Sequence, residues 1–344
     1  MTRTVMESIN AGLLQALEAD PRVVLLGEDI LDPYGGAFKA TRGCSTRFPE
    51  QVLTTPISEA CLVGMASGMA LRGMLPVVEI MFGDFLPLAA DALINHAAKF
   101  SSMYNHAAHT PLVVRTPMGG RRGYGPTHSQ TMEKYFLGVP DLTTIAPAAF
   151  DLLGSTPGDA GYLLQTAILD FESPVLFVEN KLQYLLPLQG RDDLQEFDID
   201  IIDDAGGDNP RLPVYRLAVT GAPAPAITLA AYGYMASLAQ QAVLRLAYEH
   251  EIFVELVVPT RLAPFSLEPL WERVAQTKTL VTVEEGGLSL GWGAEVCARA
   301  AERISGCRVG RVAALDAQVP ASPALEAAVL PDVDSIIRYI EKMV

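Results

Sequence analysis

Most of this 344-residue chain alternates short, continuously apolar segments with longer segments of helical character, and this alternation limits the folds open to it. In the first half, the apolar segments are 23–26 (VVLL), 76–82 (PVVEIMF), 111–115 (PLVVR), 143–146 (TTIA) and 174–179 (PVLFVE). Strands without polar alternation are typical of a parallel sheet that helices cover on both faces. The sequence therefore predicts an α/β domain over residues 1–185.

The segments between these strands have helical spacing or composition. Apolar residues recur at every fourth position over 5–19, as on one face of a helix, and Ser58 stands where a helix N-cap is expected. Parallel sheets bind ligands beyond the carboxyl ends of their strands, so Glu28, Glu59 and the loop after Arg115 stand where a site would form. The predicted helices are 5–19, 59–72, 88–100 and 150–168.

The character of the sequence changes over 186–225. Pro, Gly and Asp are dense there, as in DIDIIDDAGGDNP and GAPAPA, and periodicity is weak, which predicts a linker. A second alternating pattern over 226–344 predicts a smaller α/β domain. Its predicted strands are 226–232, 252–258, 279–285 and 309–315, and its predicted helices are 235–248, 267–276, 292–304 and 333–342.

The charge balance argues against two classes of partner. A net charge of −15 is a poor electrostatic match for nucleic acid or for an anionic membrane. No apolar run reaches the roughly 20 residues that span a bilayer. The N-terminal MTRTVMESINAG has neither the apolar core of a signal peptide nor the Arg/Ser-rich composition of a transit peptide. We therefore expect a cytoplasmic protein without a membrane or nucleic-acid partner.

Short motifs argue against two further kinds of site. The four cysteines form no CxxC pair and the five histidines form no HExxH or HxH arrangement, so a transition metal held by this chain is not expected. The glycines of EEGGLSLGWGAEV (284–296) lack GxGxxG spacing and do not open a βαβ unit. They predict tight turns and close packing rather than a dinucleotide site.

Glu59 is the first candidate for chemistry, because it stands among apolar residues in TPISEACLVG (55–64). A carboxyl group in a dry pocket has a raised pKa and can share or donate a proton near neutral pH. Its place at a helix start instead favours the anion. The local sequence leaves two interpretations open: a catalytic carboxyl, or a glutamate that only complements the helix dipole.

The glycine-rich loop after the third strand holds further candidates. His128, in GPTHSQ, has the loop setting of a positioned acid–base or hydrogen-bond donor, although many single loop histidines have no such role. Arg121 and Arg122, in GGRRGYG, have the charge to bind a phosphate or the carboxylates of a partner. A solvated surface pair is the alternative.

Together these stretches resemble a known family, the β subunits of the thiamine-diphosphate-dependent E1 component of 2-oxoacid dehydrogenase complexes. The pyruvate and branched-chain enzymes are its familiar members. The resemblance covers nearly the whole chain, and its stretches occur in the order and spacing of the family. They are LLGEDI (25–30), GGAFKATRG (35–43), TPISEACLVGMASGMA (55–70), NHAAKF (95–100), THSQ (127–130), PVLFVENKLQY (174–184) and SPALEAAVLPDV (322–333).

The resemblance implies a fold and a division of labour. The fold would be an N-terminal pyrimidine-binding α/β domain followed by a C-terminal transketolase-type α/β domain. In this superfamily a domain with a GDG motif holds the cofactor's diphosphate and Mg²⁺, and this chain contains no GDG. The implied partner is an E1 α subunit in an α2β2 heterotetramer, with the cofactor between subunits. A lipoyl-bearing E2 protein or another acyl carrier would accept the product.

The resemblance also assigns residues. Glu59 matches the glutamate that hydrogen-bonds N1′ of the aminopyrimidine ring and so promotes loss of the thiazolium C2 proton. Phe85 matches an aromatic residue packed on that ring, and Glu28 and Ile57 match positions that line the same pocket. His128 matches a histidine that contacts substrate and assists acyl transfer. A structural K⁺ in some members implies backbone ligands at Leu112, Ala167, Ile168, Asp170 and Glu172.

The chain departs from the family pattern in several places. The segment 150–166 is longer than usual, which affects the K⁺ alignment, and 186–225 matches poorly. Leu88 stands where some members have a polar residue, and Thr127 where an aromatic residue often precedes His-Ser-Gln. The donor and the acceptor of the reaction are therefore open.

Two other functions are weighed against this one. A split transketolase-like subunit would transfer a two-carbon ketol unit from a sugar phosphate to a carrier, with Arg121 and Arg122 on the phosphate. A scaffold subunit without catalysis would have no need of Glu59, Phe85 and His128, and this chain has all three.

Overall fold

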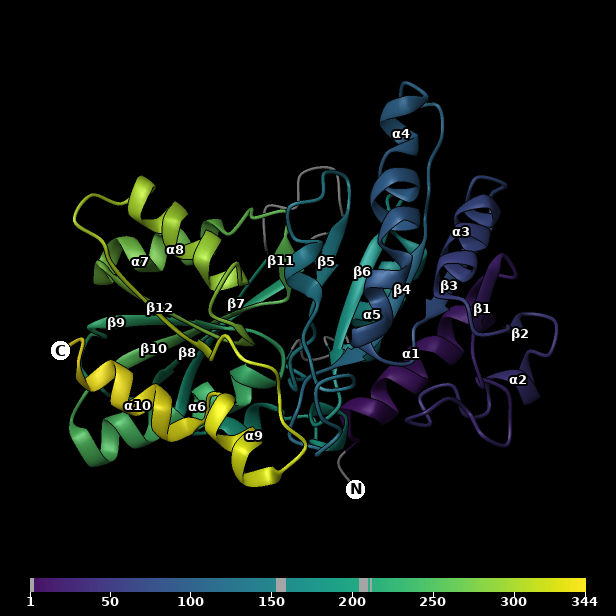
Figure 1. The fold of residues 1–344 in the computed structure, drawn as a ribbon. Helices are drawn as coiled ribbons and strands as arrows, with labels where there is room; N and C mark the ends of the chain where they lie inside the picture. The colour runs from purple at the N-terminus through teal and green to yellow at the C-terminus, as the bar shows by residue number, and fades with distance from the viewer. Residues whose placement is uncertain (1–2, 153–158, 204–209, 211) are drawn as a thin grey trace.

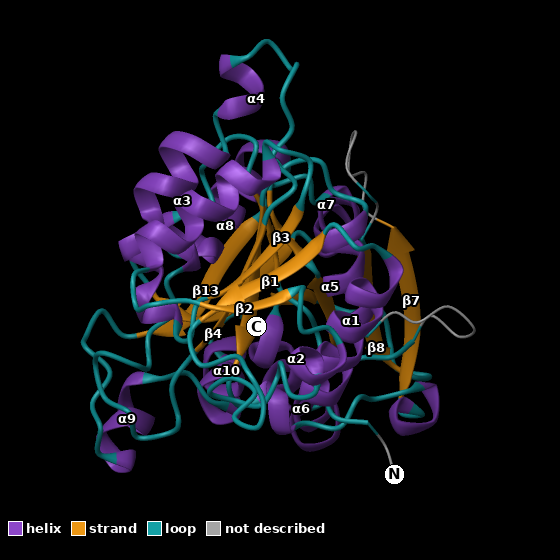
Figure 2. Ribbon diagram, turned by 90° about the vertical axis from the view of Figure 1, so that its right-hand side faces the viewer, coloured by secondary structure: helices purple, strands orange, loops and turns teal. Residues whose placement is uncertain are grey.

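The computed structural model describes residues 3–152, 159–203, 210 and 212–344. These residues form two lobes, each built on a sheet with helices against it (Figure 1). The view turned by 90° shows strands such as β1, β3 and β4 at the centre with helices around them, and β7 at one edge of the molecule (Figure 2). The α/β class predicted for both halves of the chain is confirmed.

The first sheet has the spatial order β11-β5-β6-β4-β3-β1-β2. All neighbours are parallel except β11, which comes from the second half of the chain and pairs antiparallel with β5. Parallel neighbours need crossover connections, which the intervening helices supply. The strands are β1 (Val23–Gly27), β2 (Val52–Thr54), β3 (Leu75–Glu79), β4 (Val113–Met118), β5 (Thr143–Ile145), β6 (Val175–Asn180) and β11 (Arg261–Ala263).

Successive side chains of these strands enter two different cores, one on each face of the sheet. Val24 of β1 lies in the core that contains Leu62 of α3, whereas Leu25 lies in the core that contains Leu13 of α1 and Leu164 of α5. Both faces are covered, which is why the strands lack the alternation of apolar and polar residues seen in half-exposed strands. The α-helices of this lobe are α1 (Val5–Ala19), α2 (Cys44–Arg47), α3 (Glu59–Ala70), α4 (Phe100–Met103) and α5 (Ala160–Leu169).

The helix predicted over 88–100 is instead a run of short helical pieces of different type. Pro87 lies in the first, a 3₁₀ helix, and lacks the N–H that a regular α-helix would use to bond back to Gly83. The pieces are η1 (Gly83–Ala89, 3₁₀), η2 (Ala92–Ala97, π) and α4. Other 3₁₀ turns are η3 (Glu133–Tyr135), η4 (Gln183–Leu185) and η5 (Arg191–Leu194).

The helix predicted over 150–168 is found as α5, and the part of the prediction that falls on 153–158 lies outside the described residues. Asp159 caps α5 by accepting a hydrogen bond from the Tyr162 N–H at 3.0 Å, and it also accepts the Ser8 hydroxyl of α1 at 2.6 Å. The helices touch at glycine, since a Cβ on Gly161 would lie 2.0 Å from the Ser8 carbonyl oxygen. This close contact fixes α1 and α5 on one face of the sheet.

The second sheet has the order β13-β12-β9-β10-β8-β7, parallel from β13 to β10 and antiparallel from β10 to β7. Its strands are β7 (Phe197–Asp203), β8 (Pro213–Val219), β9 (Ile227–Ala231), β10 (Val254–Pro259), β12 (Thr279–Gly287) and β13 (Arg308–Ala314). Its helices are α6 (Gly233–His250), α7 (Glu268–Thr277), α8 (Trp292–Arg303), α9 (Pro323–Val329) and α10 (Val333–Glu341).

The prediction that 186–225 is only a linker is wrong, because β7 and β8 lie within it and extend the second sheet. In β7, Ile199 and Ile201 pack against the core while Asp198 and Asp200 are exposed. This alternation is the signature of a half-exposed antiparallel edge strand, which the density of aspartate obscures in the sequence. The parts of the predicted linker at 204–209 and 211 lie outside the described residues.

The lobes share a core. The apolar cluster on the α3 side of the first sheet also includes Leu262 of β11 and, from the second lobe, Trp271 and Trp292. Among the residues that the structure describes, no helix combines the length and apolarity needed to cross a membrane.

Candidate functional site

The carboxyl ends of neighbouring parallel strands bring the candidate residues to one edge of the first sheet. Glu28 directly follows β1, Glu59 is the first residue of α3 after β2, and Phe85 follows β3. His128 lies in the loop after β4, and Lys181 directly follows β6. Because β6, β4, β3, β1 and β2 are adjacent and parallel, their ends form the crevice at which open α/β sheets bind ligands.

Glu59 is buried, with 6% of its surface exposed, at the N-terminus of α3. Ser58 occupies the N-cap position that the sequence predicts, but its side chain accepts no hydrogen bond from the N–H groups of the first helical turn. Burial raises the pKa of the neighbouring Glu28, the Glu59 carboxylate raises it further, and the Ser58 backbone N–H opposes both effects. One Glu28 oxygen, Oε1, is buried without a hydrogen-bond partner. The two carboxyls are therefore close enough for their charges to interact, and Glu28 has an oxygen free to form a further hydrogen bond.

The apolar residues around Glu59 divide into two groups. Leu62 and Val63 are buried in the core behind the carboxyl, whereas Ile57 is 82% exposed and Cys61 is also exposed. Large apolar side chains left in the open beside a buried polar group are typical of surfaces that another molecule covers. The setting of Glu59 is thus dry on one side and open to a ligand or subunit on the other.

Aromatic rings surround His128. The ring centroids of Phe82 and Phe85 lie 4.8 Å and 5.2 Å from that of the imidazole, each nearly perpendicular to it at 83°. The Thr127 hydroxyl lies 2.9 Å from His128 Nδ1, so the residue that replaces the usual aromatic is a hydrogen-bond partner of the ring. The structure thus brings together Phe85 and His128, two residues that the sequence analysis selects separately.

Lys181 lies beneath His128. Its amine is buried, donates a hydrogen bond to the His128 backbone oxygen, and faces the ring of Phe82 at 5.2 Å. Burial lowers the pKa of this amine to about 8, and the nearby Asp84 carboxylate opposes that change. Burial likewise raises the pKa of Asp84, which accepts the Gln130 backbone N–H at 3.3 Å. Sequence reasoning misses both residues, although Lys181 directly follows an apolar strand.

The two arginines of the loop have different environments. The Arg121 guanidinium donates to the Pro331 backbone oxygen and lies 6.0 Å from the ring of Tyr234, so it is part of the contact between lobes. Arg122 is exposed and lies 5.9 Å from the ring of Tyr124. The pair does not form one phosphate clamp.

The residues predicted to bind K⁺ gather around the C-terminal end of α5. Ala167 and Ile168 lie in its last turn, where carbonyls lack partners within the helix. The Leu112 oxygen accepts the Val175 N–H at 2.8 Å, and the Glu172 oxygen accepts the Thr110 N–H at 3.1 Å. Asp170 is the C-cap of the helix. In the described part of the chain, no group of three or more His, Cys, Asp or Glu side chains is arranged to hold a metal ion.

A cavity of about 890 Å³ lies elsewhere, against residues such as Lys134, Phe265 and Arg299. Neither Glu59 nor His128 lines it. The candidate site is therefore identified by its strand ends, its buried carboxyl and its ring cluster rather than by a deep hollow.

Comparison with known proteins identifies the class to which this fold and site belong. Residues 2–185 match the family model of the transketolase pyrimidine binding domain, and residues 218–336 match that of the transketolase C-terminal domain. A split gene transketolase, described as an inactive β4 tetramer, has the same fold, with a TM-score of 0.73 at 18% identity over 99% of this chain and 98% of that one.

Full-length relatives narrow the class to a family. The pyruvate dehydrogenase E1 component subunit beta of Leifsonia xyli is 34% identical over 98% of this chain and 94% of its own length. The 3-methyl-2-oxobutanoate dehydrogenase subunit beta of Mycobacterium tuberculosis is 30% identical over 99% and 91%. The acetoin:2,6-dichlorophenolindophenol oxidoreductase subunit beta of Cupriavidus necator is 31% identical over 97% and 95%. The chain belongs to the family of 2-oxoacid dehydrogenase E1 β subunits.

Proposed function

We propose that this chain supplies the pyrimidine half of a thiamine-diphosphate site and acts with an α subunit to decarboxylate a pyruvate-like 2-oxo acid. The observation that carries the proposal is the buried Glu59 at the carboxyl edge of the first sheet, paired with Glu28 and open on the side of Ile57. A carboxyl that only complemented a helix dipole would gain nothing from burial, which costs solvation.

The residues present fit the pyrimidine end of the cofactor. Glu59 would accept or share a proton at the ring nitrogen N1′, and the neighbouring Glu28 would offer its unpartnered Oε1 as a further hydrogen-bonding group. Phe85 is half-buried and would contact the ring face, with Ile57 closing the other side. When bound, thiamine diphosphate supplies the electron sink that makes loss of CO₂ possible.

His128 would act on the substrate side of the site. Its imidazole is held by Thr127, Phe82 and Phe85, which fixes the ring, and a neutral or protonated imidazole can donate to a carbonyl or carboxylate. We infer that His128 orients the 2-oxo acid and assists transfer of the acyl unit to a lipoyl carrier on an E2 partner.

The rest of the site would come from an E1 α subunit in an α2β2 heterotetramer. The sequence has no GDG motif, so the diphosphate and Mg²⁺ need a second chain, and the exposed Ile57 and Cys61 mark where it would cover the carboxyl pair. A K⁺ at the end of α5 would act by ordering that turn. The compartment that we propose is the cytoplasm.

A split transketolase-like activity is the second candidate. Its support is the exposed Arg122 beside the His128 loop, a cation that a sugar phosphate would need. The engagement of Arg121 with Pro331 weighs against a two-arginine phosphate site.

Reconstitution separates the two candidates. The chain is co-expressed with a GDG-bearing α chain, loaded with thiamine diphosphate and Mg²⁺, and assayed with pyruvate, with branched 2-oxo acids and with a ketose phosphate. We expect CO₂ release from a 2-oxo acid and no turnover of the ketose phosphate. Turnover of the ketose phosphate alone would replace the proposal by the second candidate.

A further inference from the structure

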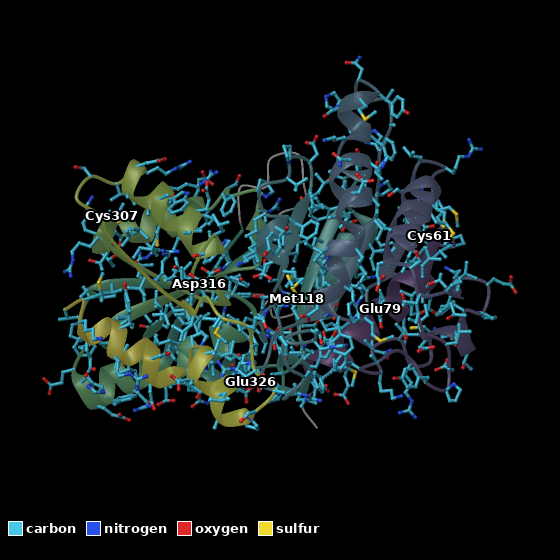
Figure 3. All side chains as sticks on the ribbon, viewed as in Figure 1. Cys61, Glu79, Met118, Cys307, Asp316 and Glu326 are labelled. Carbon is cyan, nitrogen blue, oxygen red and sulfur yellow. The ribbon has the colours of Figure 1, made fainter. Side chains whose placement is uncertain are left out.

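The loop that leads to His128 is held by carboxylates of the other lobe. Residues 119–125, here called the glycine loop, follow β4 and face β12 and α9. The Gly120 backbone N–H donates to Glu285 Oε1 at 2.6 Å. The backbone N–H groups of Arg121 and Gly123 donate to the two oxygens of Glu326 at 2.7 Å and 3.3 Å. Figure 3 marks Met118, where β4 ends, and Glu326 on α9.

Both acids are buried, and each of their carboxylate oxygens accepts a hydrogen bond. Glu285 and Glu326 are 6% and 3% exposed, and the second oxygen of Glu285 accepts the Asn180 side-chain amide at 3.0 Å. Hydrogen bonds from N–H groups to a carboxylate are about twice as strong as those between neutral groups. Glu285 therefore joins the ends of β4 and β6, and Glu326 joins the loop to the C-terminal part of the chain.

The glycine loop has an unusual backbone conformation that brings it close to these acids. Gly119 and Arg121 have φ values of +91° and +65°, in the left-handed region that favours glycine. A Cβ on Gly120 would lie 2.7 Å from Leu330 Cδ1 and 3.0 Å from Glu326 Oε1. The loop thus approaches the acids more closely than side chains at positions 119 and 120 would allow.

The far end of the same segment is fixed from the first lobe. Lys181 donates to the His128 backbone oxygen, and Asp84 accepts the Gln130 N–H. His128 therefore lies between an anchor in its own lobe and an anchor in the other lobe. Release of either anchor would let the imidazole move relative to Phe85.

We propose that Glu285 and Glu326 are positioning residues, by which the C-terminal domain fixes the His128 imidazole for its step of the reaction. The inference rests on the proposed function and adds to it a role for the second lobe. Both acids act through the backbone N–H groups of the glycine loop.

Proteolysis can test whether the two acids hold the glycine loop in place, without an assay of enzyme activity. Trypsin cleaves after Arg121 and Arg122 only if the glycine loop can leave its anchors. In the full-length chain, Glu326→Ala should speed this cleavage by about tenfold or more, and Glu326→Gln, which keeps one acceptor oxygen, should speed it less. Glu302→Ala, the loss of an exposed acid on α8 of the same lobe, is the matched control and should leave the rate unchanged. Equal cleavage in all variants would overturn the inference.

Kinetics in the reconstituted α/β pair then tests the role. Displacement of a reacting group by about 1 Å can cost on the order of 100-fold, so Glu326→Ala should lower kcat for acyl transfer to a lipoyl domain by 10- to 100-fold. Decarboxylation measured with an artificial electron acceptor should change less than acyl transfer, with partial recovery in Glu326→Gln.

A double-mutant cycle separates positioning from a general loss of structure. If Glu326 acts through His128, Glu326→Ala should add little to the loss already caused by His128→Ala. Losses that multiply would overturn the inference, as would a Glu326→Ala variant with full acyl transfer. An inactive wild-type pair would count against the proposed function instead. The cleavage assay would still show whether Glu326 holds the glycine loop.

Discussion

Arg115 holds together the carboxyl edge of the first sheet, and its removal has a predictable energy. The guanidinium is 1% exposed, and it donates to the two oxygens of Glu179 at 2.8 Å and 2.5 Å and to Glu79 on its other side. The Tyr184 hydroxyl also donates to Glu179. One cation thus serves two buried carboxylates at the ends of β3 and β6, and Figure 3 marks Glu79.

Arg115→Met keeps most of the apolar length of the side chain but leaves both carboxylates without a counter-charge. Breaking a buried ion pair by removing one partner costs about 3–5 kcal/mol. That is a large part of the roughly 5–15 kcal/mol by which a folded domain is stable. We therefore expect Arg115→Met to lower the free energy of unfolding by about 3–5 kcal/mol at pH 8.

The loss should depend on pH. Burial raises the pKa of Glu79 in the folded protein, and without Arg115 this carboxyl will bind a proton more readily than in the unfolded chain. An acid with a raised folded pKa favours the folded state at low pH and loses that contribution as pH rises through the folded pKa. The deficit of the variant should therefore shrink as pH falls from 8 to 5.5.

Urea unfolding of the full-length chain, followed by far-UV circular dichroism at both pH values, gives these free energies. Arg22→Met is the matched control, since Arg22 forms an exposed pair with Asp20 whose loss should change the stability little. A variant as stable as the control at pH 8, or a deficit that grows as pH falls, would refute the reasoning.

Two further predictions concern stability. Burial raises the pKa of Glu284 from 4.5 to about 7, so ionisation of this group should lower the free energy of unfolding by up to about 3 kcal/mol as pH rises from 4.5 through 7. Glu284→Gln should remove this dependence of stability on pH, as measured by urea unfolding at pH 5.5, 7 and 8. Gly161→Ala should lower the free energy of unfolding by about 1–3 kcal/mol, and with it Tm, because the added methyl group would push α1 away from α5. Gly138→Ala is the control and should leave Tm unchanged, because a methyl group there has no neighbour within contact distance.

The sequence predicts the fold where a single rule governs the residues. Segments 23–26 and 174–178 are apolar without alternation because both faces of the first sheet are covered, and they are found in β1 and β6. The edge on which Glu28, Glu59 and the glycine loop lie follows from the same rule, since ligand sites form at the carboxyl ends of parallel strands.

Other features depend on tertiary contacts that local sequence does not encode. The three residues of β11 enter the first sheet from the far half of the chain, and the period of β7 is hidden by its aspartates. Lys181, Glu285 and Glu326 have ordinary sequence settings, and only the folded chain shows that they anchor the segment around His128. Glu285 and Glu326 form these hydrogen bonds only because the two lobes meet at the glycine loop.

The most direct test of the central claim is Glu59→Gln in the reconstituted α/β pair. The amide keeps the size of the buried side chain, so the Tm of the chain should stay close to that of Glu50→Gln, an exposed control. Thiamine-diphosphate-dependent release of CO₂ from the 2-oxo acid should fall by about 10²- to 10⁴-fold, the usual loss of a proton-transfer group. Wild-type rates in Glu59→Gln would contradict the account.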